Sequence, residues 1–301
     1  MTAPNQTHQT EKNRMYFLLC VLVCIWGLDY VVAKDALVLL DPLSLVFFKY
    51  IVATIFVLVV RLKTEKGPLF RKKDIWLFVV CAIFGDILYF FCEYTAMDYM
   101  PVSLISIVIS LVPVISIVTE AIVFKRRTSK KVIIGVFVCI FGIVLIIGVD
   151  WHILLEGRLI GYILAFGCVL CWNIFNFVTE SLHERYETVT LTLNQLLCTL
   201  IMLTPYVLFN LSKLPAFTPT LTGEVVYLGL LSCGIGFLIQ VRGLHVLGPT
   251  TSVLFANFFP VTATFFGWLF LGETIEPIQI AGGAIVVIAG YFVIKEKGKT
   301  I

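Results

Sequence analysis

The stretch AMDYMPVSLISIVISLVPVISIVTEAIVF, from Ala96 to Phe124, is similar to GLHVLGPTTSVLFANFFPVTATFFGWLFL, from Gly243 to Leu271. When Pro113 is aligned with Pro260, the offset between the two stretches is 147 residues (260 minus 113). Other positions match at this offset or within one residue of it: Ser110 with Asn257, Ser103 with Thr250, Gly135 with Gly282, and Trp26 with Trp172. These matches predict that the chain contains an internal repeat, with two similar halves.

The composition is typical of a membrane protein. Hydrophobic residues make up 59% of the 301 residues and charged residues 14%, whereas soluble domains are about half apolar and about a quarter charged. Apolar runs of roughly twenty residues recur, each long enough to cross a bilayer as a helix, and they lack the alternation of a transmembrane barrel. The sequence predicts an all-α integral membrane protein with ten spans: 15–37, 43–62, 74–97, 101–125, 130–149, 158–182, 188–211, 223–245, 249–271 and 277–295.

The distribution of positive charge predicts the topology. Lys and Arg gather at Arg61–Lys73, at Lys125–Lys131 and at the C-terminal KEKGK, and the joints near 38–42, 150–157 and 272–276 have none. By the positive-inside rule, both termini are cytoplasmic. Since these clusters are topology signals, no nucleic-acid partner is expected.

The domain organisation follows from the repeat and the topology. It comprises a cytoplasmic tail at 1–14, a five-span repeat at 15–149, a second at 158–295, and a tail at 296–301. Because five is odd, the second repeat enters the membrane from the opposite side. Inverted repeats of this kind are typical of secondary transporters, whose binding site lies near the midplane between the repeats.

Several chemistries have no sequence signature. The nine cysteines all fall inside spans and form neither a disulfide framework nor a zinc motif with His partners. The four histidines are scattered, and HExxH, GxSxG and GxxxxGK[ST] are not found. We therefore expect no metal centre, no cofactor, no ATP hydrolysis and no enzyme activity.

Two carboxylates in the third span point to a cavity. Asp86 and Glu93 are nearly two helical turns apart and share one predicted face with Tyr89. A charge that faces lipid is costly, so this face should line a cavity or contact a partner. Similar polar and aromatic stripes on other spans complete the predicted cavity: Trp26, Asp29, Tyr30, Ser106, Ser110, Trp172, Asn176, Gln240 and Asn257.

Each candidate also has a purely structural interpretation. Serines in membrane helices often bond a carbonyl one turn back. Pro113 and Pro260 either only kink their helices or act as hinges. Lys49 can form an ion pair with Glu93 or with Asp29. Three acids against one lysine would still leave an excess of acidic groups. This excess fits either proton coupling or binding of a substrate ammonium, to which Tyr30, Tyr89 or Trp26 would add cation–π attraction of about 0.5–2 kcal/mol.

Several motifs carry a family resemblance over about 15–295: WGLDYVVAK, FFKY, EYTAMDYMPVS, GLHVLGPTTSVLFANFFPV and GWLFLGE. With these, the chain resembles the EamA-type permeases of the drug/metabolite transporter superfamily. It departs from the family pattern at Lys49, where Arg is usual, and at Asp29, which is more often neutral in relatives. The resemblance implies two EamA repeats and a central cavity lined by the first, third, fourth, sixth, eighth and ninth spans. It also implies transport of small metabolites, amino acids or drugs, most often outward.

The expected function is secondary active export of small polar metabolites, amino acids or amines by alternating access, with a proton as a candidate coupling ion. A facilitative channel, a membrane-embedded enzyme and a receptor are the alternatives. The expected partners are a small-molecule substrate and the lipid bilayer, in a multi-pass protein of a bacterial cytoplasmic membrane. The Gly-rich last span, AGGAIVVIAG, packs either within the chain or against a second copy in a homodimer.

Overall fold

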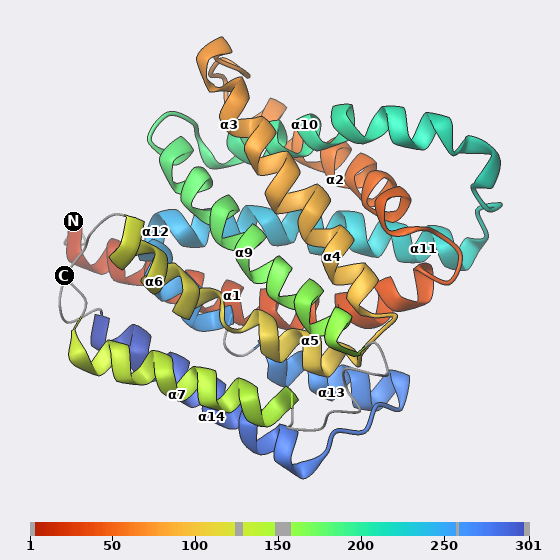
Figure 1. Cartoon of the computed structure of the whole chain (residues 1–301). Coiled ribbons are helices and arrows are strands. Elements are labelled where there is room, and N and C mark those ends of the chain that lie inside the picture. The colour runs from red at the N-terminus through yellow and green to blue at the C-terminus, as the bar shows by residue number, and fades with distance from the viewer. Residues whose placement is uncertain (1–3, 124–128, 148–157, 257–258, 298–301) are drawn as a thin grey trace.

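A computed structural model describes residues 4–123, 129–147, 158–256 and 259–297, and no β-strand occurs among these residues. The fold is therefore all-α, as predicted (Figure 1). Its α-helices are α1 (Pro4–Ala36), α2 (Pro42–Thr64), α3 (Ile75–Val80), α4 (Tyr89–Ala96), α5 (Val102–Ile109), α6 (Val112–Val123), α7 (Lys130–Ile147), α9 (Arg158–His183), α10 (Thr188–Phe209), α11 (Pro219–Tyr227), α12 (Gly236–Ala256), α13 (Phe259–Leu271) and α14 (Pro277–Lys297). Two 3-10 segments, η1 (Lys72–Asp74) and η3 (Leu211–Lys213), and two π segments, η2 (Cys81–Leu88) and η4 (Leu228–Ile235), complete it.

The starts of the helices follow local sequence signals. The side chain of Asp41 accepts hydrogen bonds from the backbone N–H groups of Leu43 and Ser44, both at 3.1 Å, and Pro42 is the first residue of α2. Such a cap satisfies donors that the helix itself leaves free, and proline suits the first helical position.

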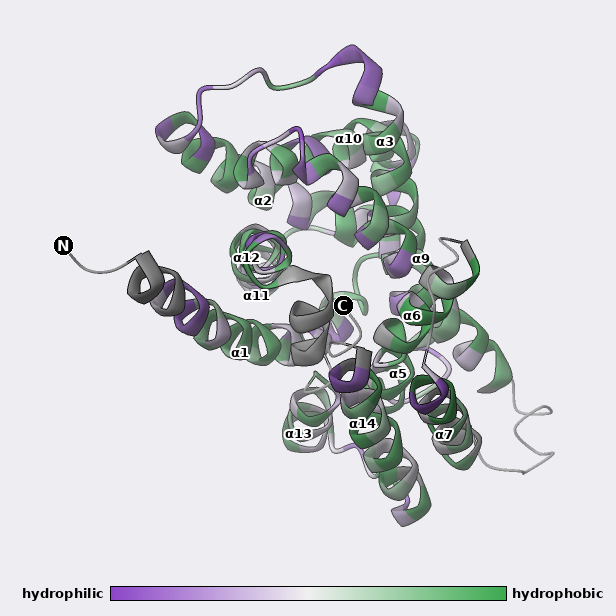
Figure 2. Ribbon diagram, turned by 90° about the vertical axis from the view of Figure 1, so that its left-hand side faces the viewer, coloured by the Kyte–Doolittle hydropathy of each residue, from purple (hydrophilic) through white to green (hydrophobic). Residues whose placement is uncertain are grey.

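Seven helical stretches are long and apolar enough to cross a membrane, judged by length and composition in the described part of the chain: Thr10–Ala36, Pro42–Thr64, Lys72–Ala96, Val102–Thr119, Leu159–His183, Thr188–Phe209 and Pro219–Leu247. Shorter apolar helices cover Phe259–Leu271 and Ile280–Val293. Hydrophobic residues dominate most helices (Figure 2). The chain is a multi-pass membrane protein, while the count of ten spans and the side of each terminus stay predictions.

One expected joint differs from the structure. The turn predicted at 246–249 is absent, because α12 continues without a break to Ala256. Pro249 therefore lies inside a helix. Membrane helices tolerate proline where neighbouring groups satisfy the carbonyl that it frees.

The repeat is visible in the secondary structure. The π segments η2 and η4 begin at Cys81 and Leu228, and both differences, 228 minus 81 for the starts and 235 minus 88 for the ends, are 147. The helices α6 and α13 start at Val112 and Phe259, with the same offset. Since π helices are rare, two of them at matched positions are strong evidence that the halves share one architecture.

The two halves are intertwined. The first helix of each half packs against helices of the other half: α1 against α12 and α13, and α9 against α4, η2 and α5. The last helices of the two halves, α7 and α14, also run side by side (Figure 1). A Cβ atom at Gly142 would lie 2.9 Å from the carbonyl oxygen of Gly282. The Gly-rich last helix thus makes a close contact within the chain.

Candidate functional site

A cavity of about 80 Å³ lies between the two halves, and a volume of about 10–15 Å³ is enough for one water. Helices of the first, third, fourth, sixth, eighth and ninth predicted spans line it. The lining residues are Leu19, Leu22, Val23, Trp26, Asp29, Tyr30, Tyr89, Phe90, Glu93, Ile109, Val112, Trp172, Ser232, Phe237, Gln240 and Phe259. Seven of the predicted cavity residues are among them: Trp26, Asp29, Tyr30, Tyr89, Glu93, Trp172 and Gln240.

Matched positions of the two repeats line this one cavity. At offsets of 146 or 147 residues, the lining pairs are Trp26 with Trp172, Phe90 with Phe237, Glu93 with Gln240, and Val112 with Phe259. The two tryptophan rings are in edge contact, with centroids 6.2 Å apart and an interplanar angle of 86°. The cavity therefore lies where the repeats meet.

Glu93 is anchored by two tyrosines. Its Oε1 atom accepts hydrogen bonds from the hydroxyls of Tyr30, at 2.8 Å, and Tyr89, at 2.7 Å. Tyr30 comes from α1 and Tyr89 lies one turn before Glu93 on α4. Two donors on one oxygen fix the side chain at the cavity wall and compensate part of the cost of burying it.

Asp29 is the second acidic group of the cavity. It is 6% exposed, and its Oδ1 atom has no hydrogen-bond partner within the described part of the chain. Trp26, one turn earlier on α1, donates from Nε1 to the carbonyl of Ser232 at 3.4 Å. Asp29 thus brings to the cavity a buried oxygen, Oδ1, that accepts no hydrogen bond from the described residues, while the side chain of Ser232 interacts with the same carboxyl group.

Lys49 does not pair with either acid. Its Nζ atom donates to the hydroxyl of Tyr94 at 2.5 Å and lies 3.4 Å from the centroid of the Phe90 ring. No ion pair among the described residues involves Lys49. The ion pair considered from the sequence is therefore not formed, because a hydroxyl and a ring face hold the ammonium instead.

Asp86 does not line the cavity, although the sequence placed it there. Its carboxylate accepts hydrogen bonds from Tyr50 of α2, at 2.6 Å, and from Thr199 of α10, at 2.5 Å. The prediction that Asp86 and Glu93 share one face assumed α-helical geometry throughout. Asp86 lies in the π segment η2, whose wider turn shifts the direction of every preceding side chain.

Three further candidates lie outside the lining. The hydroxyl of Ser106 donates to the carbonyl of Ser103 at 2.7 Å, and that of Ser110 donates to Ile107 at 2.6 Å. Both serines thus follow the structural alternative, in which the hydroxyl bonds a carbonyl of the preceding turn. Asn176 is buried, and neither atom of its amide has a partner among the described residues.

The proposed hinges start helices. The fourth predicted span is interrupted at Ser110 and Leu111, and Pro113 is the second residue of the following helix, α6. Pro260 is likewise the second residue of α13. Proline fits the first turn of a helix, where its missing N–H costs little. Asn257 lies outside the described residues, and a hinge function of the prolines stays a prediction.

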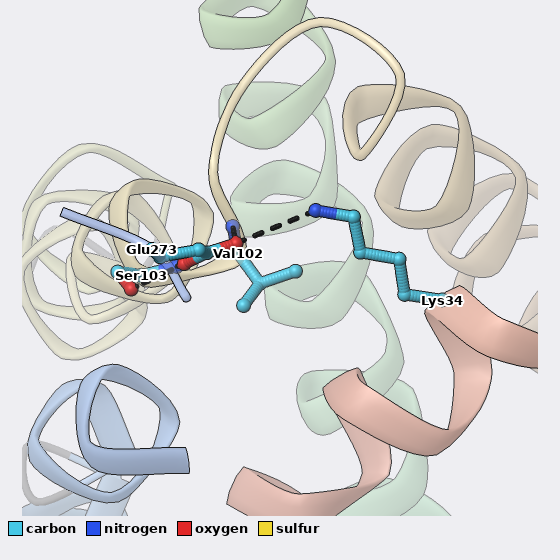
Figure 3. Close-up of polar contacts among 4 residues, drawn as sticks. All are labelled: Lys34, Val102, Ser103 and Glu273. Carbon is cyan, nitrogen blue, oxygen red and sulfur yellow. Dashed lines mark hydrogen bonds and ion pairs between the residues drawn. The ribbon is translucent and has the colours of Figure 1, made fainter. Parts of the chain in front are cut away.

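Glu273 joins the start of α5 to the segment that follows α13, and it also contacts Lys34 (Figure 3). Its Oε1 atom accepts from the backbone N–H of Val102 at 2.9 Å, and Oε2 accepts from the N–H of Ser103 at 3.2 Å and from its hydroxyl at 2.6 Å. Lys34 lies 3.4 Å from Oε1. Gly272 has a φ of +65°, a conformation that suits glycine and that turns the chain after α13.

Glu65 makes the corresponding arrangement at the other end. It accepts from the backbone N–H groups of Val189, at 2.9 Å, and Thr190, at 2.7 Å, and from the Thr190 hydroxyl at 2.6 Å. The 23 residues of α2 separate the two ends by roughly 35 Å. Each glutamate caps a helix of the opposite half. Neither was predicted as a site residue, although Glu273 ends the GWLFLGE motif.

A larger hollow, of about 650 Å³, lies beside Glu65. It is lined by charged and polar groups that include Arg242, His183 and His245, and the two histidine rings are stacked with centroids 5.7 Å apart. Leu238 of α12 lines this hollow, and Gln240 of the same helix lines the cavity. The two spaces are therefore neighbours.

The fold and the cavity define a multi-pass membrane protein that has an internal space between two repeats. The model of the EamA-like transporter family matches residues 13–148 and 159–295, so the chain belongs to this family. The family indicates a transporter rather than an enzyme.

Known relatives match over almost the whole chain. An uncharacterized transporter of Archaeoglobus fulgidus is 24% identical over 285 residues, which cover 94% of this chain and 100% of the relative. A probable amino-acid metabolite efflux pump of Salmonella typhimurium is 25% identical over 290 residues, covering 92% and 93%. A solved crystal structure with 17% identity superposes with a TM-score of 0.67 and covers 94% of this chain and 98% of the other, which shows a shared fold.

Proposed function

We propose that this protein is a secondary active transporter that exports small polar metabolites, amino acids or amines by alternating access across a bacterial cytoplasmic membrane. The cavity between the repeats carries the proposal, because matched residues such as Glu93 and Gln240 line it from both halves. Secondary transporters with repeated halves bind their substrate in such a place. The name of the Salmonella relative, an efflux pump, supports the outward direction.

A carrier fits the ends of the molecule better than an open channel does. Glu273 ties α5 to the second half at one end, and Glu65 ties α10 to the first half at the other. A carrier opens one such end at a time, whereas a channel needs both open together. The hollow beside Glu65 is the proposed entry from the cytoplasm.

The proposed driving force is an ion gradient, with the proton as the coupling ion. Glu93 is the group that takes up and releases this proton, because it is buried at the cavity and has a carboxylate oxygen held by two hydroxyls. Ionisable residues inside membrane proteins often form proton relays. The proton would leave as the cavity opens to the other side.

The test uses purified protein in liposomes that are exposed to a whole-cell metabolite extract, with an imposed proton gradient. Wild type, Glu93→Gln and empty liposomes run side by side, and captured solutes are identified by mass spectrometry. Saturable capture that the folded variant loses supports the carrier. Flux that rises linearly with solute concentration would favour a channel, and no enrichment over empty liposomes contradicts transport of small metabolites.

A further inference from the structure

The charges at the cavity wall are all of one sign, and this bears on the substrate class. Asp29 and Glu93 line the cavity, and the described lining residues include no Lys, Arg or His. The buried Lys49 lies outside the lining, and its ammonium contacts Tyr94 and Phe90. A solute in this cavity thus meets two acidic groups and no basic lining residue, while Lys49 attracts both acids from outside the lining.

The two acids offer different oxygens to a solute. Glu93 Oε1 already accepts two tyrosine hydroxyls. Asp29 Oδ1 accepts no hydrogen bond among the described residues and is nevertheless buried. A buried acceptor without a donor costs about 1–3 kcal/mol, so a solute that donates to Asp29 would recover that energy.

Aromatic rings line the same cavity as this acceptor. Trp26 lies one turn from Asp29 on α1, and its ring contacts Trp172 at a centroid distance of 6.2 Å. Tyr89 contacts the same Trp172 ring at 5.1 Å. Faces of Trp and Tyr attract organic cations. The arrangement therefore combines a hydrogen-bond acceptor for an ammonium group with aromatic walls for its carbon skeleton.

Within the proposed transport function, we infer that the cavity takes organic amine cations that lack a carboxylate, with Asp29 accepting the ammonium. A zwitterionic amino acid would bring its own carboxylate beside Asp29 and Glu93. That carboxylate would lose its water without gaining a hydrogen bond from a basic lining residue, because Lys49 is held by Tyr94 and Phe90, and burying a charge without such a partner is costly. The cavity thus discriminates against the carboxylate of a zwitterion.

The test is direct binding to the full-length protein in detergent, measured by titration calorimetry. The two probes are isobutylamine and valine, which differ only by the carboxylate of valine. Isobutanol, which has a hydroxyl in place of the ammonium, is the control. We expect isobutylamine to bind at least about tenfold more tightly than valine, a difference of about 1.4 kcal/mol. Isobutanol should not compete with isobutylamine.

Two variants distinguish loss of the binding site from a general effect of removing a buried carboxyl group. Asp29→Asn should lose isobutylamine binding. Asp86→Asn is the matched control, because Asp86 is also a buried aspartate but lies outside the lining. It should bind isobutylamine within about threefold of wild type, less than about 0.7 kcal/mol.

Equal or tighter binding of valine, binding of neither probe, or unchanged binding by Asp29→Asn would overturn the inference. If Asp29→Asn does not fold, two wild-type measurements test the inference: the ratio of the affinities for isobutylamine and valine, and the competition with isobutanol. Capture of amino acids by the proteoliposomes, together with rejection of isobutylamine, would leave the transporter standing and refute only the substrate class. A protein that captures no solute at all would refute the transporter itself.

Discussion

Glu93 and Gln240 stand at equivalent positions of the two repeats, 147 residues apart (240 minus 93), and both line one cavity. Their side chains have the same length and nearly the same shape, but only one ionises. Two of the other matched lining pairs are identical, Trp26 with Trp172 and Phe90 with Phe237, whereas the acidic character of this position belongs to one half alone.

The variant Glu93→Gln would make this pair identical. We expect it to fold, because the amide oxygen still accepts from Tyr30 and Tyr89, and to lose proton-coupled transport, since an amide does not titrate. A pH-sensitive dye inside proteoliposomes should report proton movement with substrate in wild type and none in the variant. Asp86→Asn, which removes a buried carboxyl group outside the cavity lining, is the control and should retain coupling. Coupling that survives Glu93→Gln excludes Glu93 as the proton carrier.

Removing the cap at Glu273 should loosen one end of the molecule. Glu273→Ala leaves the N–H groups of Val102 and Ser103 without an acceptor, and loss of a cap typically costs about 0.5–2 kcal/mol. Hydrogen exchange measured by mass spectrometry should become faster in the first turn of α5. Lys34→Ala should accelerate this exchange less, because a partly exposed ion pair contributes about 0–1 kcal/mol. Equal acceleration in the two variants would contradict the claim that the cap, and not the ion pair, stabilises the start of α5.

The equivalent change at the other end should act on a different helix. In Glu65→Ala we expect faster exchange in the first turn of α10, where Val189 and Thr190 lose their acceptor. The first turn of α5 should keep its wild-type rate, because the two ends lie roughly 35 Å apart. Simultaneous acceleration at both ends would contradict independent closures.

The contact between α7 and α14 should be sensitive to a single methyl group. Gly142→Ala would place a Cβ atom 2.9 Å from the Gly282 carbonyl oxygen, and overpacking of this kind costs about 1–3 kcal/mol. Gly223→Ala is the matched control, since nothing lies within 4 Å of its Cβ position, and alanine there should stabilise α11 by up to about 1 kcal/mol. In thermal unfolding in detergent, the Tm of Gly142→Ala should lie below that of wild type and the Tm of Gly223→Ala above it.

The helical fold was accessible to sequence reasoning, because hydrophobic length and internal similarity determine it. The same similarity paired Trp26 with Trp172, and the cost of a charge that faces lipid pointed to Glu93; all three line the cavity. The turn expected at 246–249 failed because a helix in a membrane accommodates Pro249.

Two other predictions failed because they assumed α-helical geometry around Asp86 and an ion pair for Lys49. The π segment η2 has no clear signal in a run of apolar residues, so Asp86 was assigned to the wrong surface. The contact of Lys49 with Tyr94 and Phe90 depends on packing between distant segments. The caps at Glu65 and Glu273 likewise join segments that only the tertiary structure brings together.

The matched π segments also bear on how the two repeats arose. A π turn accommodates one residue more than an α turn, as a single inserted codon would supply. Both copies have this turn at the same place, Cys81–Leu88 and Leu228–Ile235. The simplest history is that the insertion already existed in an ancestor half as long, before duplication and fusion produced the present chain.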